Sequence, residues 1–262
     1  MRVRIHDGPV SCGEAAAAEA AGVLRAVLAE RERADVIVAT GASQFETLRA
    51  LTREPGIDWS RVRAFHLDEY VGLPETHPAS FRRYLRERFL EKLPVRPEFI
   101  PVRGDASDLA AELGRLSALI SGVTIDLCLA GIGENGHLAF NDPPADFVTS
   151  DPYLVVDLDE ACRRQQLGEG WFGRLDEVPR RAVSMSIREV LRARRVIVTA
   201  PDLRKAIAIR MAVEGPVTPM CPSSALQNHP DCVLHLDRAS ASQLRRNEGW
   251  VQHGFRIAPL GG

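Results

Sequence analysis

The 262-residue sequence has few of the features that mark several protein classes. It holds only five cysteines and no CxxC pair, which argues against zinc ribbons and redox motifs and predicts a reducing compartment, with the cytoplasm as the expected location. No apolar run approaches the ~20 residues of a membrane span, and no secretory leader pattern is recognisable. The formal net charge of −2 gives no excess of basic residues. We therefore expect no nucleic-acid partner and no membrane partner.

The remaining composition is that of an ordinary globular protein, with 45% hydrophobic and 26% charged residues. The sequence shows no internal repeat, low-complexity tract or linker. A chain of this length can form one α/β domain with a substantial core, so we expect a single domain over 1–262. The segment 143–180 lacks a clear pattern and carries several glycines. It is interpreted as a possible lid over a site, with a plain surface excursion as the alternative.

Short apolar runs alternate with helical patterns along the chain. The expected strands cover 36–39, 62–67, 125–130, 196–200 and 233–236. The expected helices cover 14–33, 44–53, 80–91, 109–120 and 203–214, the first opened by a capping box from Ser11 to Glu14. Strands separated by helical crossovers pair in parallel. The predicted fold class is therefore α/β, a Rossmann-like doubly wound, mainly parallel sheet with helices on both faces.

The most informative segment is LCLAGIGENGHLAFNDPP at 127–144. An apolar strand leads into a glycine-rich turn that carries Asn135, His137 and Asp142 within eight residues. Open α/β sheets bind their ligands just past the carboxyl ends of strands, so these side chains are candidate catalytic residues. A carboxylate can fix the tautomer of a histidine and leave its second nitrogen free to move protons. Asp142 and His137 are therefore a candidate acid–base pair.

Two other interpretations of this segment compete with an acid–base pair. GIGENG at 131–136 matches the dinucleotide fingerprint, but that motif needs its last glycine to open a long helix. Pro143 and Pro144 follow too soon, because proline breaks a helix interior, and no organic cofactor is expected. The second alternative is a structural turn with an incidental histidine. The sequence contains no GxSxG elbow, HExxH motif or Cys/His cluster, so neither serine hydrolysis nor a metal is expected.

Candidate anion ligands follow two further strands. Thr40, Gly41, Ala42 and Ser43 lie between an expected strand and a helix, an order that favours a phosphate cradle, although Ser43 is also an ordinary N-cap. Lys205 follows the strand at 196–200 and could neutralise the same phosphate. The alternative is a solvated helix lysine, because lysine is mostly exposed.

Two adjacent carboxylates, Asp68 and Glu69, follow the strand at 62–67. Successive side chains of an extended chain point in opposite directions, so only one of them should face the crevice. Asp68 is the candidate base, because a partly shielded carboxylate has a raised pKa and can take a carbon-bound proton. For Glu69, a helix cap or an ion pair is the favoured interpretation.

Together these residues resemble a known family. FHLDEYVGL at 65–73, continued by HPASF at 77–81, and GIGENGHLAFNDP at 131–143 resemble two signatures of the isomerising glucosamine-6-phosphate deaminases. Lys205 with AVEG at 212–215 resembles the family's phosphate-lysine helix, and SALQNHP at 224–230 its C-terminal segment. The resemblance covers nearly the whole chain in order.

The resemblance implies a cofactor-free reaction on a small-molecule sugar phosphate. Glucosamine 6-phosphate would open its ring, move a proton from C2 to C1 and release ammonia, giving fructose 6-phosphate. Asp68 matches the enolisation base and His137 the ring-opening proton acceptor. Asn135 falls where members carry aspartate or asparagine, and Asp142 where the family usually has glutamate.

The sequence also departs from the family pattern. The phosphate loop usually reads TGGT or TGST, whereas residues 40–43 read TGAS. The family's second phosphate arginine falls at Gly170, and Arg163 or Arg164 is considered as its replacement. A 6-phosphogluconolactonase-like hydrolase and a non-catalytic sugar-phosphate sensor are the alternative functions. The sequence identifies neither the sugar epimer nor an effector, and a homo-oligomer is possible.

Overall fold

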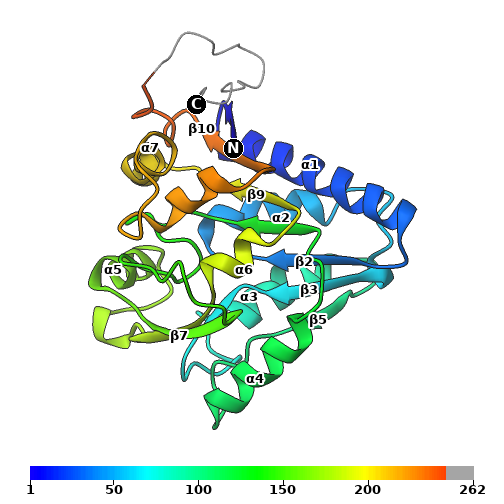
Figure 1. Ribbon diagram of the computed structural model, residues 1–262, viewed down its shortest axis with the longest axis horizontal. Coiled ribbons are helices and arrows are strands. Elements are labelled where there is room, and N and C mark those ends of the chain that lie inside the picture. The colour runs from blue at the N-terminus through cyan, green and yellow to red at the C-terminus, as the bar shows by residue number, and fades with distance from the viewer. Residues whose placement is uncertain (246–262) are drawn as a thin grey trace.

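The structure is a computed structural model that describes residues 1–245. Its central feature is a seven-stranded sheet, seen between layers of helices in Figure 1. Every strand pair in this sheet is parallel, which confirms the predicted mainly parallel architecture. In spatial order the strands are β1 (Arg2–His6), β10 (Cys232–Asp237), β9 (Arg195–Thr199), β6 (Leu127–Ala130), β2 (Ala34–Val38), β3 (Val62–His66) and β5 (Glu98–Ile100).

Helices cover both faces of this sheet, as predicted. One hydrophobic cluster joins it to α1 (Pro9–Glu30), α2 (Phe45–Leu51) and α3 (Phe81–Arg88), and another joins it to α4 (Leu109–Ile120), α6 (Ile187–Leu191) and α7 (Ala206–Glu214). Strand β2 shows how the sequence supports two layers. Val36 and Val38 belong to the first cluster and Ile37 to the second, because successive strand residues point to opposite faces.

Helix α1 begins earlier than its sequence pattern predicts. Gly8 is the N-cap and Pro9 the first helical residue, a position where the missing proline N–H costs nothing. Ser11 lies at the third helical position, where its hydroxyl accepts a hydrogen bond from the Gly8 N–H at 3.2 Å. The predicted capping box from Ser11 to Glu14 is therefore wrong, because the proline moves the helix start toward the N-terminus.

A second sheet was not predicted. It contains β4 (Asp68–Tyr70), β8 (Arg181–Met185) and β7 (Tyr153–Asp157), and both of its pairings are antiparallel. The segment 143–180, interpreted as lacking regular structure, holds β7, the helix α5 (Glu160–Gly168) and a 3-10 turn at Leu175–Glu177. Strand β4 begins two residues after β3 ends, so its first residue, Asp68, lies just past the carboxyl end of the main sheet.

The order of the strands places a crevice between β2 and β6. These two strands are neighbours, yet the chain continues from β2 outward to β3 and β5, and from β6 outward to β9 and β10. Loops that leave such neighbouring strands in opposite directions create the gap in which doubly wound sheets bind ligands. The prediction of a single domain over 1–262 includes residues 246–262, which lie outside the described part of the chain.

The cysteines are all free and buried in the described part of the chain, and Cys128 and Cys232 are core residues, as expected. Among residues 1–245, no helix combines the length and the apolar character that crossing a membrane requires.

Candidate functional site

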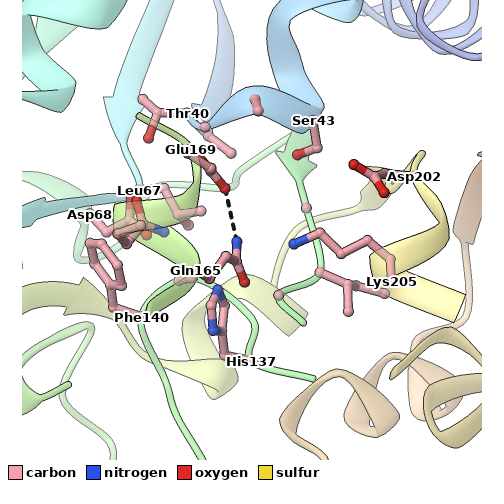
Figure 2. Close-up of a pocket in the computed structure, with 18 of the residues that line it drawn as sticks. Thr40, Ser43, Leu67, Asp68, His137, Phe140, Gln165, Glu169, Asp202 and Lys205 are labelled. Atoms are coloured by element: carbon pink, nitrogen blue, oxygen red, sulfur yellow. Dashed lines mark hydrogen bonds between the residues drawn. The ribbon is translucent and has the colours of Figure 1, made fainter. Parts of the chain in front are cut away.

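A cavity of about 210 Å³ opens at the crevice between β2 and β6. The loops that follow β2, β3, β6 and β9 form its wall, and Figure 2 shows their side chains directed into one space. The sequence-predicted residues in the wall are Thr40, Gly41, Ala42, Ser43, Asp68, His137 and Lys205. Asn135 and Asp142 do not line the cavity and lie behind His137.

Asp68 and Glu69 divide as their alternation predicts. Asp68 lines the cavity and is 5% exposed, and its Oδ1 atom makes no hydrogen bond within residues 1–245. Burial raises the pKa of Asp68 well above its usual value, and the negative charge of Glu69 adds to this shift. Glu69 points the other way and accepts hydrogen bonds from the Phe81 and Arg82 N–H groups at 3.1 and 2.9 Å. It therefore anchors the start of α3.

In the loop after β6, the His137 ring packs directly against the backbone of Gly133, where there is no room for a side chain. A Cβ atom on Gly133 would lie 2.2 Å from the His137 ring, so any side chain there would displace the imidazole. The side-chain Oδ1 atom of Asn135 accepts a hydrogen bond from the His137 backbone N–H at 3.0 Å. Nδ1 of His137 lies 3.2 Å from Oδ1 of Asp142, although the ring is turned so that Nδ1 is not well aligned for a hydrogen bond.

Asp142 is held by donors on every side. Asn135 Nδ2 donates to its Oδ1 at 2.9 Å, and the Asp159 N–H donates to its Oδ2 at 2.9 Å. Burial alone would raise the pKa of Asp142, but the nearby His137 imidazole, together with those two donors, outweighs burial and lowers the pKa. Asp142 is thus a fixed anion beside the imidazole.

The turn after β2 passes close to the turn after β6. Gly41 has a φ of +90°, a conformation that favours glycine, and a short helical turn, Ala42–Gln44, follows it. A Cβ atom on Gly131 would lie 2.8 Å from the Ser43 hydroxyl. The first N–H groups of a helical turn have no partner inside it, so this turn offers donors to an anion.

Lys205 is 5% exposed, which excludes the interpretation as a solvated lysine. It ends a 3-10 turn, Leu203–Lys205, whose N-cap Asp202 accepts a hydrogen bond from the Arg204 N–H at 3.0 Å. Burial lowers the pKa of Lys205, and the charges of Glu169 and Glu134 partly oppose that shift. A buried cation facing an open cavity favours an anionic ligand.

Residues 9–234 match the family model of glucosamine-6-phosphate isomerases and 6-phosphogluconolactonases. The chain belongs to this family. A glucosamine-6-phosphate deaminase of Listeria monocytogenes serotype 4b (strain CLIP80459) is 38% identical over 79% of this chain and 86% of its own length. One from Streptococcus sanguinis (strain SK36) is also 38% identical, with the same coverage of both chains.

Two known structures share the family fold. A monomeric glucosamine-6-phosphate deaminase superposes with a TM-score of 0.85 at 31% identity, covering 93% of this chain and all of that one. A 6-phosphogluconolactonase from Shewanella baltica OS155 gives a TM-score of 0.74 at 18% identity, covering 90% of this chain and 96% of that one. The second likeness is one of fold alone.

Neither candidate replacement for the family's second phosphate arginine, Arg163 or Arg164, reaches the cavity. Arg163 donates to the Val178 carbonyl at 3.0 Å, and Arg164 is paired with Glu160 in solvent. Neither lines the cavity, whereas Arg204 does. Gly170 has a φ of +83°, so the backbone at the family's arginine position takes a conformation that disfavours a side chain.

Helix α5 supplies cavity residues that the sequence analysis missed, namely Gln165, Gln166 and Glu169. Gln165 joins the helix to the loop after β6, because its Oε1 accepts a hydrogen bond from the Glu134 N–H at 2.8 Å. Its Nε2 donates to Glu169, at the end of the same helix, at 3.0 Å (Figure 2). The available signal was Asp159, an N-cap whose side chain accepts from the Cys162 N–H. That cap would have predicted α5, but not its position against the cavity.

The fold also assembles a group that the sequence spacing does not show. His137, Asp142 and Cys162 each place one potential metal-ligand atom within 4.8 Å of the other two. The absence of a Cys/His cluster in the sequence was therefore an insufficient reason to expect no metal-binding group, because Cys162 reaches the loop only through the fold.

Proposed function

We propose that this protein is an isomerising glucosamine-6-phosphate deaminase, converting glucosamine 6-phosphate and water to fructose 6-phosphate and ammonia. One observation carries the proposal. A single cavity joins a buried carboxylate without a hydrogen bond on its Oδ1, an imidazole backed by a carboxylate, and a buried lysine. The family membership and the names of the 38%-identical relatives support the same reaction.

In this proposal Asp68 moves the proton between carbons. A base must take the proton from C2 of the open-chain sugar, and the electron pair then forms an enol with C1. Return of the proton to C1 moves the double bond to C2 and nitrogen, and water then adds to this imine at C2. Breakage of the C2–N bond releases ammonia and leaves the ketose. A carboxylate with a raised pKa is a stronger base than an ordinary aspartate, which suits Asp68 to this step.

His137 is assigned to ring opening. Opening the pyranose breaks the C1–O5 bond, removes the proton of the C1 hydroxyl and requires a proton on O5. With Nδ1 facing Asp142, the Nε2 atom is available to exchange these protons. Asp142 and Asn135 do not line the cavity, so they act as positioning residues that hold the ring and stabilise its charged form.

The phosphate is placed between the 40–43 turn and Lys205. The turn offers backbone donors and the Ser43 hydroxyl, and Lys205 supplies the buried charge. Arg204 lies in the same wall, paired with Asp202 and Glu134, and could exchange one of these partners for phosphate.

The segment 143–180 is proposed as the lid, with α5 as its cavity-facing part. The contact of Gln165 with the Glu134 N–H crosses from this segment to the loop after β6 and would hold the lid closed over substrate. The free buried cysteines fit a reducing compartment, so we place the enzyme in the cytoplasm.

Ammonia release from a panel of 2-amino-2-deoxyhexose 6-phosphates tests the function. The glucosamine epimer should give stoichiometric ammonia and fructose 6-phosphate. Hydrolysis of 6-phosphogluconolactone without ammonia release from any amino sugar would instead support the lactonase alternative.

A further inference from the structure

Three unlike side chains meet behind the cavity wall: His137, Asp142 and Cys162. His137 and Cys162 are 7% and 1% exposed, and the Asp142 side chain is 5% exposed. His137 and Asp142 come from the loop after β6, whereas Cys162 lies in the first turn of α5. None of the roles proposed above uses the thiol.

The donor atoms of this trio lie close enough together to converge on one metal ion. Two ligand atoms of a tetrahedral zinc, each ~2.0–2.2 Å from the ion, are separated by roughly 3.3–3.6 Å. Nδ1 of His137 and Oδ1 of Asp142 are 3.2 Å apart, and all three donor atoms lie within 4.8 Å of one another. Small side-chain movements would bring them to bonding distance.

A second observation points to a ligand. The Nδ1 atom of His137 is buried and makes no well-aligned hydrogen bond in the described part of the chain. Asp142 is already oriented by outer donors, because Asn135 Nδ2 and the Asp159 N–H each donate to it at 2.9 Å. Ligating carboxylates are held by such outer hydrogen bonds in known metal sites.

We propose that His137, Asp142 and Cys162 form a site for one thiophilic divalent cation, Zn²⁺, which inhibits the enzyme. Binding releases the thiol proton of Cys162 and any proton on Nδ1, and leaves the imidazole fixed to the metal. A fourth position is left for water or another ligand. His137 would then be unable to relay protons, so the ion is an inhibitor rather than a cofactor; this inhibition rests on the proposed function, whereas binding does not.

Binding is tested with Co²⁺, which reports thiolate ligation by a charge-transfer absorption in the near ultraviolet. The unmodified protein should bind one Co²⁺ per chain with this band, and Zn²⁺ should abolish it. Cys162→Ser, close in size, should lose the band, and Cys162→Ala is the second variant. Cys221→Ala is the matched control, because Cys221 is also buried but outside the trio.

Circular dichroism and thermal melting establish that each variant is folded. Absence of a thiolate band in the unmodified protein, or an unchanged band in folded Cys162→Ser, would overturn the site.

Inhibition is tested by ammonia release in the presence of Zn²⁺. The unmodified enzyme should lose activity, regain it with a chelator and be protected by substrate, which occupies the entrance beside His137. Losing an outer-shell partner typically weakens metal binding about 10- to 100-fold, so losing the thiolate in Cys162→Ser should raise the inhibitory Zn²⁺ concentration at least that much. Equal inhibition of both proteins would overturn the inhibitory role. Because the Co²⁺ band needs no turnover, failure of the deaminase proposal would be recognised separately.

Discussion

The carboxylates of Asp68 and Glu69, adjacent in β4, point to opposite sides of the strand and into opposite environments. Asp68 faces the cavity with an Oδ1 atom that makes no hydrogen bond within residues 1–245. Glu69 is fully buried and accepts from the Ser80 hydroxyl at 2.8 Å and from two N–H groups at the start of α3. One strand therefore presents a reactive group and a structural group side by side.

Asp68→Asn should lower kcat by about 10²–10⁴, because the amide keeps the size of the side chain and removes its basicity. KM should change much less. The same variant should unfold at a higher temperature near neutral pH. A folded-state pKa above the unfolded value means that stability is lost as pH rises between the two, and asparagine does not ionise.

Ammonia-release kinetics and thermal melting at pH 7 and at pH 3 check this prediction. The gain in melting temperature should vanish at the lower pH, where Asp68 is protonated in both states. Near-normal turnover by the folded variant would contradict the assignment of Asp68 as the base.

Glu69→Gln should have the opposite effect on stability. A glutamine cannot accept from all of the donors around Glu69, and an unsatisfied buried donor costs about 1–3 kcal/mol. Removing the like charge should also lower the pKa of Asp68 and move the acid limb of the kcat/KM profile to lower pH. Asp105→Asn is the control, because Asp105 also pairs with Arg82 but is not a source of the Asp68 shift. An acid limb that stays in place in Glu69→Gln would show that another group sets it.

His137→Gln should impair the cyclic sugar more than an open-chain analogue, because only the cyclic form needs ring opening. Asp142→Asn should show the same selectivity to a smaller degree, since it removes the fixed anion beside the ring but leaves the imidazole in place. The measurement is kcat/KM for both substrates with each variant. Equal losses on both substrates would assign His137 to a later step.

Lys205→Met should raise KM for the phosphorylated sugar about 10- to 100-fold, since charge-assisted hydrogen bonds contribute roughly 1.5–3 kcal/mol. Unphosphorylated glucosamine should be affected much less. Arg164→Ala is the matched control, because Arg164 is a solvent-exposed cation that does not line the cavity. If Lys205→Met weakens both substrates by one factor, the phosphate lies elsewhere.

Much of the cavity wall was predictable because it follows the strands of a parallel sheet. The turn at 40–43, Asp68, His137 and Lys205 each come shortly after an apolar run, and parallel strands bring their carboxyl ends to one edge. Even the division between Asp68 and Glu69 follows from the two-residue period of extended chain. The sequence by itself thus determined the α/β fold class and the loops that form the cavity.

Tertiary structure alone decided what lies against those loops. Gln165 and Glu169 enter the wall, and Cys162 approaches His137, because α5 folds back over the cavity. The sheet that supports this return pairs β4 with β8, more than a hundred residues apart in sequence. Local propensity and spacing carry no information on such a pairing, since its stability comes from hydrogen bonds and side-chain contacts that exist only after the chain has folded.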